Sequence, residues 1–342
     1  MVALVQYELG AERVEIRELP VPEPDAGEVV LAVGAVGVCG SDVHQLHGTQ
    51  SWSVRTPVVL GHEFTGTVAA VGRGVTGFRE GDRVVSETAA RICGECVYCR
   101  SGAYNVCPHR LGFGYGLDGA MAGSVRTPAR CLHSIPDSLP AHCAALVEPA
   151  SVAYTAVVDR SEIRPGDTIV VLGPGPIGLL CLLFARLRGA GAVVVVGLPR
   201  DEARRQLART LGASRTVSPS QVPEVVSSLG DGLGAHLVID ASGATAAFRT
   251  AMQVVRPLGQ ITKVGWGPEP ADYTLDPLVA KAVTVRGSFS HTYPTWERVI
   301  ELLSAGLLDV SPLIGARLPL DSWREGFDRM HNGEIVKAVL HP

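Results

Sequence analysis

A glycine-rich turn between an apolar strand and an apolar helix constrains the fold of this chain most. The segment TIVVLGPGPIGLLCLLFARLRG gives a strand from Thr168 to Leu172, then the turn G-P-G-P-I-G and a helix. The glycine pattern alone is weak evidence, but a dinucleotide-binding βαβ unit requires such a strand before it and such a helix after it. The helix N-terminus would then face the pyrophosphate. The residues expected to bind the dinucleotide are Gly173, Gly175, Pro176, Ile177 and Gly178.

Alternating strands and helices continue after this turn. The run AVVVVG is typical of a second strand, EARRQLARTLGA of a helix that ends at Gly212, and HLVIDASG and GQITKVGW of further buried strands. This alternation predicts an α/β domain with a doubly wound parallel sheet. Because 342 residues exceed what one hydrophobic core usually supports, we expect two domains.

Four of the eight cysteines lie within the segment ICGECVYCRSGAYNVC, with the spacing C-x2-C-x2-C-x7-C. Disulfides are rare in a reducing cytosol, so a metal explains the cluster better. Four thiolates from one loop favour a closed, tetrahedral structural zinc site, and an iron–sulfur cluster is the alternative. Unliganded thiols would leave a reactive loop without benefit. The expected ligands are Cys93, Cys96, Cys99 and Cys107.

Three further segments offer a second, mixed set of metal ligands. VGVCGSDVH contains Cys39, LGHEFTGTV contains His62, and ALVEPASVAYTA places Glu148 among apolar residues. A thiolate, an imidazole and a carboxylate together form a zinc site whose fourth position stays open for water or substrate. Taken singly, they are more typical of a small core residue, a buried histidine and a carboxylate at a helix start.

These segments occur together in an order that resembles the zinc-dependent medium-chain alcohol and polyol dehydrogenases, most of all the sorbitol and threonine dehydrogenase branch. The resemblance covers essentially the whole chain. It implies a GroES-like, mostly β catalytic domain at residues 1–150, a Rossmann nucleotide-binding domain at 151–285 and a C-terminal return to the catalytic domain at 286–342. It also implies a homodimer or homotetramer.

The same resemblance assigns roles around the open metal site. Cys39 and His62 are similar to the catalytic zinc ligands of the family, and Glu148 to the third. Glu63 resembles the adjacent glutamate that ligates the metal directly or in exchange with water. Which glutamate is bound stays open in the sequence.

A proton relay is the second implied feature of this site. Ser41 and His44 follow Cys39 closely and resemble the hydroxyl and imidazole that carry the alcohol proton to solvent. His44 as an ordinary polar loop residue is the alternative. We expect Asp42 to orient its loop and not to bind metal.

The chain departs from the family pattern at the expected cofactor ribose. NAD-binding domains place Asp or Glu at the end of the second strand, whereas this strand ends in Gly197. Gly197 leaves room for a 2′-phosphate, and Arg200, Arg204 and Arg205 follow, which favours NADP. Alternatively the arginines line a solvent-facing helix surface, and Asp201 or Glu202 contacts the ribose.

A second departure concerns the substrate. Where polyol-oxidising relatives carry an Arg-Tyr pair, the segment GSFSHTYPTW has Ser290 and His291. His291 is either a substitute hydrogen-bond donor, part of a pocket for a cyclitol or amino alcohol, or a polar surface residue.

The sequence therefore predicts a zinc-dependent enzyme that reversibly transfers hydride between a secondary alcohol and NAD(P), with two zinc ions per subunit. The alternatives are a zinc-free quinone or enone reductase of the same superfamily and a non-catalytic nucleotide-sensing protein. With 30 Lys and Arg against 34 Asp and Glu, the charge gives no support for a nucleic-acid or anionic-membrane partner. The N-terminus lacks signal-peptide features, so we expect a cytoplasmic protein.

Overall fold

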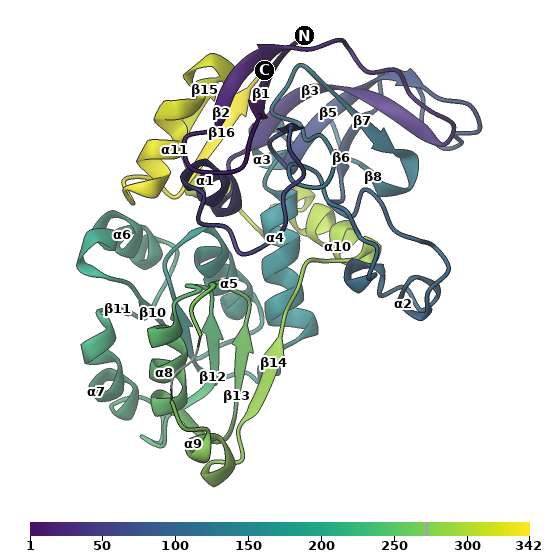
Figure 1. The fold of residues 1–342 in the computed structure, drawn as a ribbon. Helices are drawn as coiled ribbons and strands as arrows, with labels where there is room; N and C mark the ends of the chain where they lie inside the picture. The colour runs from purple at the N-terminus through teal and green to yellow at the C-terminus, as the bar shows by residue number, and fades with distance from the viewer. Residues whose placement is uncertain (271–272) are drawn as a thin grey trace. The chain divides into compact units, whose positions relative to one another are not determined.

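The computed structural model describes residues 1–270 and 273–342, and the chain divides into two compact units. Unit 1 comprises Met1–Ser151 and His291–Pro342, and unit 2 comprises Val152–Ser290 (Figure 1). The two units divide after residues 151 and 290, whereas the resemblance predicted domain boundaries after residues 150 and 285. The C-terminal segment of unit 1 consequently begins at His291.

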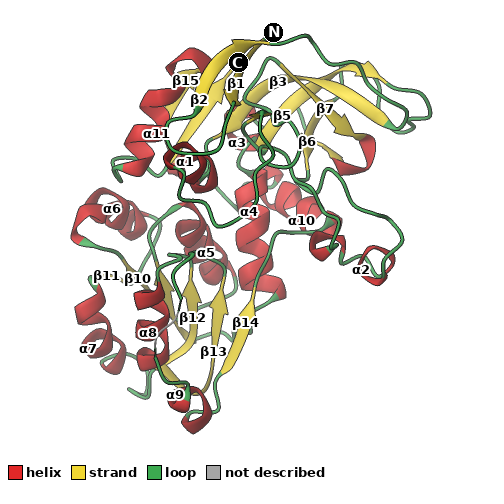
Figure 2. Cartoon of the chain, in the orientation of Figure 1, coloured by secondary structure: helices red, strands yellow, loops and turns green. Residues whose placement is uncertain are grey.

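Unit 1 is built mainly from antiparallel strands and long loops (Figure 2). Its main sheet has the order β15-β16-β3-β5-β6-β8 with β7 paired to β3, and a smaller sheet has the order β2-β1-β4. The strands are β1 (Val2–Gln6), β2 (Val14–Glu18), β3 (Glu28–Gly37), β4 (Val58–Val59), β5 (Glu63–Val71), β6 (Arg83–Ser86), β7 (Ser124–Pro128), β8 (Leu132–Ser134), β15 (Ile314–Pro319) and β16 (Lys337–His341).

Short helices connect the strands of unit 1. They are α1 (Gly40–His47), α2 (Val97–Arg100), α3 (Ala141–Ala144), α10 (Tyr293–Ser304) and α11 (Trp323–His331), and α4 (Val147–Tyr154) begins in this unit. A core of aliphatic and aromatic side chains packs around β3 and β5, with Leu31, Phe64 and Phe113 almost completely buried. The apolar positions of these strands therefore bury one continuous hydrophobic core.

The pairing of β3 with β5 positions the candidate site. Gly37, at the end of β3, is the register partner of Glu63, at the start of β5. Cys39 follows the first of these residues closely and His62 immediately precedes the second. Two segments that are distant in the sequence thus meet at one edge of the sheet.

Unit 2 contains a parallel sheet with helices packed against it. The strand order is β11-β10-β9-β12-β13-β14, and each pair of neighbouring strands is parallel. The strands are β9 (Thr168–Leu172), β10 (Ala192–Val196), β11 (Arg215–Val217), β12 (Ala235–Asp240), β13 (Val255–Lys263) and β14 (Thr284–Gly287). The helices are α5 (Pro176–Leu187), α6 (Glu202–Thr210), α7 (Val222–Ser227), α8 (Thr245–Val254) and α9 (Asp276–Ala280).

This order confirms the predicted doubly wound sheet. Numbered from β9, it is the 3-2-1-4-5-6 order of dinucleotide-binding domains: β10 and β11 are added on one side of β9, and β12 to β14 on the other side. All five residues of β9 are buried, as expected for a central parallel strand. The glycine-rich turn follows this strand and so lies at the switch point where such sheets bind ligands.

One helical stretch, Ala141–Asp159, is long and apolar enough by composition to cross a membrane. In this fold 72% of its most apolar window is buried inside the protein. Its apolar character is therefore accounted for by core packing.

Candidate active site

The sulfur of Cys39, a nitrogen of His62 and a carboxylate oxygen of Glu63 lie within 4.8 Å of one another. Cys39 precedes α1, and the other two residues lie at the start of β5. The cluster is built entirely from unit 1. Three ligand atoms of the types that zinc prefers are thus within reach of a single ion.

Asp42 stabilises the two segments that carry this cluster. Its side chain is fully buried, its Oδ2 accepts a hydrogen bond of 2.8 Å from the Cys39 backbone N–H, and its Oδ1 lies 3.8 Å from His62 Nδ1. Burial lowers the pKa of His62, but the charges of Asp42 and Cys39 outweigh burial and raise it well above its usual value. A carboxylate behind a ligating imidazole is a common way to orient the ring toward a metal.

Glu63 is also held by a cation. Lys337 Nζ donates a 2.7 Å hydrogen bond to Oε1 of Glu63 and a 2.8 Å hydrogen bond to the Val38 carbonyl, and it forms an ion pair with Glu63 Oε2 at 2.5 Å. Burial lowers the pKa of Lys337, but the charges of Glu63 and Cys39 more than offset this and raise it. Lys337 is therefore a charged residue in direct contact with the candidate ligand set.

Glu148 lies outside the 4.8 Å cluster, but its charge acts on both His62 and Lys337. Its Oε1 lies 3.1 Å from His291 Nε2, and Trp296 Nε1 donates a 2.6 Å hydrogen bond to His291 Nδ1. His291 is only 1% exposed, which excludes the alternative that it is a polar surface residue. Both of its ring nitrogens face protein groups.

Ser41 and His44 both lie on α1, three residues apart, which places them on one face of the helix. The buried Ser41 hydroxyl oxygen has no hydrogen-bond partner among the described residues. His44 Nδ1 lies 2.8 Å from Thr49 Oγ1. Burial lowers the pKa of His44, and the nearby His331 and His47 lower it further.

The residues of this cluster fit a bound zinc ion. A thiolate, an imidazole and a carboxylate are the usual protein ligands of an open zinc site. The Ser41 hydroxyl, buried and unsatisfied by the protein within the described part of the chain, supplies the polar partner that a reacting alcohol would need. The donor set and this orphaned oxygen are both consistent with a metal-bound substrate.

The four clustered cysteines form a second potential metal site. Their sulfur atoms lie within 4.8 Å of one another in the loop around α2. Backbone N–H groups point at three sulfurs, with N···S distances of 3.3–3.4 Å, and the hydrogen bonds from Cys96 and Glu95 lower the pKa of Cys93 to about 6. Amide donors stabilise thiolates, which are the form that binds metal. This arrangement fits a closed four-thiolate zinc site.

The glycine-rich turn in unit 2 has the close backbone packing expected of a dinucleotide site. Helix α5 begins at Pro176, with Gly175 as its N-cap. A Cβ on Gly178 would lie 1.9 Å from the Gly173 carbonyl oxygen, so only glycine fits there. The turn thereby brings the free N–H groups of the helix start close to the end of β9.

The residues after β10, where the cofactor ribose is expected to bind, pack against each other and form hydrogen bonds within the protein. A Cβ on Gly197 would lie 2.8 Å from Pro174, so close packing against the turn already requires glycine at this position. Asp201 Oδ2 accepts a 2.9 Å hydrogen bond from the Leu198 backbone N–H, and Glu202 binds Arg205 and Arg209. The Arg200 side chain is exposed, and Arg204 lies 3.9 Å from Asp201.

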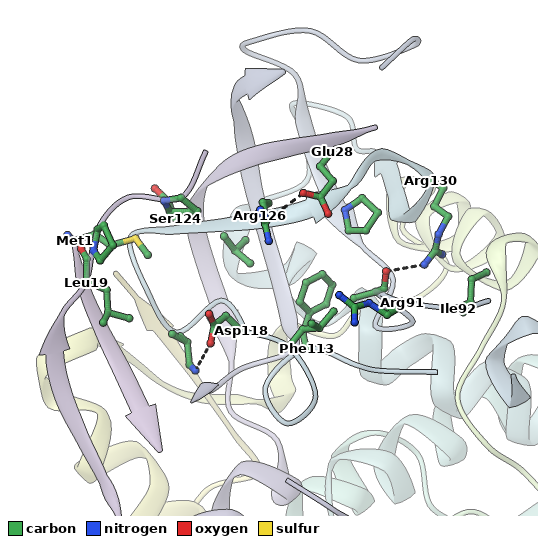
Figure 3. A pocket seen from close by; sticks show the side chains of 18 residues that line it. Met1, Leu19, Glu28, Arg91, Ile92, Phe113, Asp118, Ser124, Arg126 and Arg130 are labelled. Atoms are coloured by element: carbon green, nitrogen blue, oxygen red, sulfur yellow. Dashed lines mark hydrogen bonds and ion pairs between the residues drawn. The ribbon is translucent and has the colours of Figure 1, made fainter. Parts of the chain in front are cut away.

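A separate cavity of about 600 Å³ opens on unit 1 beside the small sheet (Figure 3). Arg91, Arg126 and Arg130 line it together with Glu28 and Asp118. Within the described residues, its lining includes none of the candidate ligands. This cavity and the metal-ligand cluster are therefore different features of unit 1.

Two residues of the site were not predicted from the sequence. Lys337 is the single charge in the apolar strand segment IVKAVL, which is a signal for a buried partner. Trp296 carries no comparable signal, because a tryptophan in an amphipathic helix is usually a core residue.

Two family models match the chain. The model described as alcohol dehydrogenase GroES-like domain matches residues 25–137, and the model described as zinc-binding dehydrogenase matches residues 176–305. A sorbitol dehydrogenase from Halalkalibacterium halodurans is 37% identical over 345 residues, which is 100% of this chain and 99% of the relative. A D-arabitol-phosphate dehydrogenase from Enterococcus avium is also 37% identical, over 97% of this chain and 94% of the relative.

Solved structures share the fold over the same length. A zinc-binding dehydrogenase from Sinorhizobium meliloti 1021 bound to NADP has a TM-score of 0.90 and 29% identity, covering 100% of this chain and 99% of that chain. An alcohol dehydrogenase from E. coli CFT073 complexed with NADH also has a TM-score of 0.90, with 27% identity and the same coverage.

Proposed function

The chain belongs to the zinc-binding alcohol dehydrogenase family, and from that premise we propose that it reversibly transfers hydride between a secondary alcohol and a nicotinamide dinucleotide. The substrate class is a polyol, cyclitol or amino alcohol. The observation that carries this proposal is the meeting of Cys39 and His62 with the buried carboxylate of Glu63, while the charge of a second buried carboxylate, Glu148, acts on the same His62. A zinc-free reductase would have no use for such a ligand set.

We assign Cys39, His62 and Glu148 as the ligands of the catalytic zinc. Charge balance supports Glu148 over Glu63. With Cys39 and Glu148 as anions, a divalent ion is neutralised and the Glu63–Lys337 pair remains neutral beside it. If Glu63 left Lys337 for the metal, the buried lysine would lose its partner, and an unpaired buried charge costs several kcal/mol.

Zinc bound there supplies a Lewis acid that lowers the pKa of the alcohol hydroxyl. The chain's own residues then handle the proton. Ser41 Oγ accepts it from the alcohol, and the path continues along α1 to His44, whose lowered pKa keeps its imidazole uncharged and able to accept. Thr49 holds the His44 ring through Nδ1. Asp42 and Lys337 keep the surrounding ligands in place.

We propose that the dinucleotide binds at the turn from Gly173 to Gly178, with a preference for NADP over NAD. The two carboxylates nearest the end of β10, Asp201 and Glu202, already accept hydrogen bonds from the protein. Arg200 is exposed and offers a planar donor set suited to a 2′-phosphate. Because packing alone requires Gly197, the preference rests on Arg200 and Arg204 and not on the glycine.

The cofactor proposal is tested by the ratio of kcat/KM for NADP to that for NAD on one substrate. Arg200→Ala should lower this ratio roughly tenfold to a hundredfold, since a charge-assisted hydrogen bond contributes about 1.5–3 kcal/mol. Arg188→Ala, which removes an exposed arginine after α5, is the matched control. A wild-type preference for NAD would contradict the proposal.

The remaining proposals concern assembly and location. We propose a second, structural zinc at Cys93, Cys96, Cys99 and Cys107, a homodimer or homotetramer, and a cytoplasmic location. All eight cysteines are free thiols, which suits a reducing compartment. Light scattering tests the assembly.

The function itself is tested by a substrate screen. Zinc-loaded protein is mixed with NAD or NADP and with representative polyols, polyol phosphates, cyclitols and threonine, and nicotinamide reduction is followed by absorbance. At least one secondary alcohol should give saturable reduction, and the matching ketone should reoxidise the reduced cofactor. Failure of every alcohol with both cofactors would contradict the proposal.

A further inference from the structure

The contacts of His291 determine which of its nitrogens carries the proton. Trp296 Nε1–H is only a donor, so His291 Nδ1, 2.6 Å away, must be the acceptor. In the uncharged ring the proton then lies on Nε2. That nitrogen lies 3.1 Å from Glu148 Oε1 and donates to it. The chain of hydrogen bonds runs in one direction, from Trp296 through His291 to Glu148.

Burial and packing hold this arrangement in place. Trp296 is 0% exposed and His291 1% exposed, and their rings meet edge to face with centroids 4.9 Å apart. Trp296 also stacks on the buried His133 at an interplanar angle of 10°. Thr88 Oγ1, 3.5 Å from His291 Nε2, closes the remaining side. Both nitrogens are engaged by protein groups, and among the described residues the contact of His291 with a candidate zinc ligand is the one to Glu148.

We propose that Trp296 and His291 form a positioning pair that orients the Glu148 carboxylate for the catalytic zinc. The hydrogen bond from His291 fixes Oε1 and leaves Oε2 for the metal, and Trp296 sets the tautomer of His291 that can donate. Groups behind a ligand commonly change metal affinity tenfold to a hundredfold when they are removed. This inference rests on the ligand assignment of the proposed function.

A purely structural role makes a different prediction. If His291 only filled core space, its removal would lower stability without a specific effect on one metal site. The four-cysteine loop provides an internal reference, because it belongs to the same unit and none of its ligands contacts His291 within the described residues. A positioning role requires that only the mixed site loses affinity.

The experiment measures zinc affinity at the mixed site by chelator competition, together with the visible spectrum of protein carrying Co²⁺ at that site. The variants are His291→Leu, His291→Gln, Trp296→Phe and the double variant of His291→Leu with Trp296→Phe. Glutamine places an N–H donor near the position of Nε2 and should restore binding partly. His341→Leu, which removes a histidine bound to the Gly34 carbonyl, is the control.

We expect His291→Leu to weaken zinc binding about tenfold to a hundredfold and to change the Co²⁺ spectrum. Trp296→Phe should act in the same direction, and the double variant should be no worse than His291→Leu, since both changes break one hydrogen-bonded chain. Retention of zinc by the four-cysteine loop verifies folding. If His291→Leu does not fold, the zinc affinity of Trp296→Phe is compared with that of His341→Leu, and this comparison tests the positioning role in the same way.

Affinity within about twofold of wild type in both His291→Leu and Trp296→Phe, or additive losses in the double variant, would overturn the inference. Failure of the proposed function has a different signature: wild-type protein would then show no metal binding that Cys39→Ser abolishes. The two failures are therefore distinguishable in one set of titrations.

Discussion

The Lys337 ammonium lies 2.5 Å and 2.7 Å from the two carboxylate oxygens of Glu63, and both side chains are 1% exposed. The two residues are separated by 274 positions and meet because β16 and β5 both pair with β3. A fully paired buried glutamate next to Cys39 and His62 explains how the site can contain two carboxylates without excess charge.

The Lys337–Glu63 pair gives the first prediction. Lys337→Met leaves a buried carboxylate unpaired and should destabilise the metal-free protein by about 3–5 kcal/mol in denaturant unfolding. Adding Glu63→Gln to the same chain should recover much of this loss, because no unpaired charge remains. Equal stability of Lys337→Met and wild type would show that the pair contributes nothing.

The second prediction separates the two metal sites. Zinc analysis of fully loaded protein should give two ions per subunit. Cys39→Ser should lose one ion and most activity while the fold persists, whereas Cys96→Ser should lose the other ion and lower stability first. A single zinc in carefully loaded wild-type protein would contradict the two-site assignment.

Ser41 is expected to act on the proton and not on the metal. Ser41→Ala should therefore slow turnover on the order of 10²-fold, which is typical for loss of a general acid–base group, and leave zinc content unchanged. Steady-state rates and metal analysis on the same preparation measure both quantities. Normal turnover across the pH range would rule out the relay.

The pH dependence should report on His44. Its pKa lies below the usual 6.5 because of burial and because of His331 and His47. Uncharged imidazole accepts the proton, so alcohol oxidation should persist below pH 6.5 and fall as the pH drops through the lowered pKa. His331→Asn removes one repelling charge, raises the pKa of His44 and should shift the acid limb of kcat to higher pH.

The control for this shift is His44→Gln, which should abolish the acid limb of the kcat–pH profile. An acid limb at the same pH in wild type and His331→Asn would show that His44 does not govern it.

Much of the metal chemistry was predictable from the sequence, whereas the contacts behind it were not. Cys39, His62 and the four-cysteine loop stand in segments whose residue types and spacing already indicate zinc. The pairing of Gly37 with Glu63 that brings two of these segments together depends on sheet register, which local patterns do not encode.

His291 shows most clearly that the local sequence does not reveal which residues become buried. It lies in the polar segment SFSHTYP, which is typical of an exposed loop, yet it is buried against Trp296 and Glu148. The burial comes from tertiary packing of α10 and is invisible in the local sequence. Gly197 shows a related ambiguity, because close packing against Pro174 by itself accounts for a glycine at this position.

A zinc titration of hydride transfer tests whether the mixed metal site is catalytic. Protein stripped of metal and reloaded with one equivalent for the four-cysteine loop receives increasing zinc, and the rate of nicotinamide reduction by the best alcohol of the screen is recorded. The rate should rise in proportion to the second equivalent and then level off, and Cys39→Ser should stay inactive throughout. Full activity before the second equivalent is added would contradict a catalytic role for the mixed site.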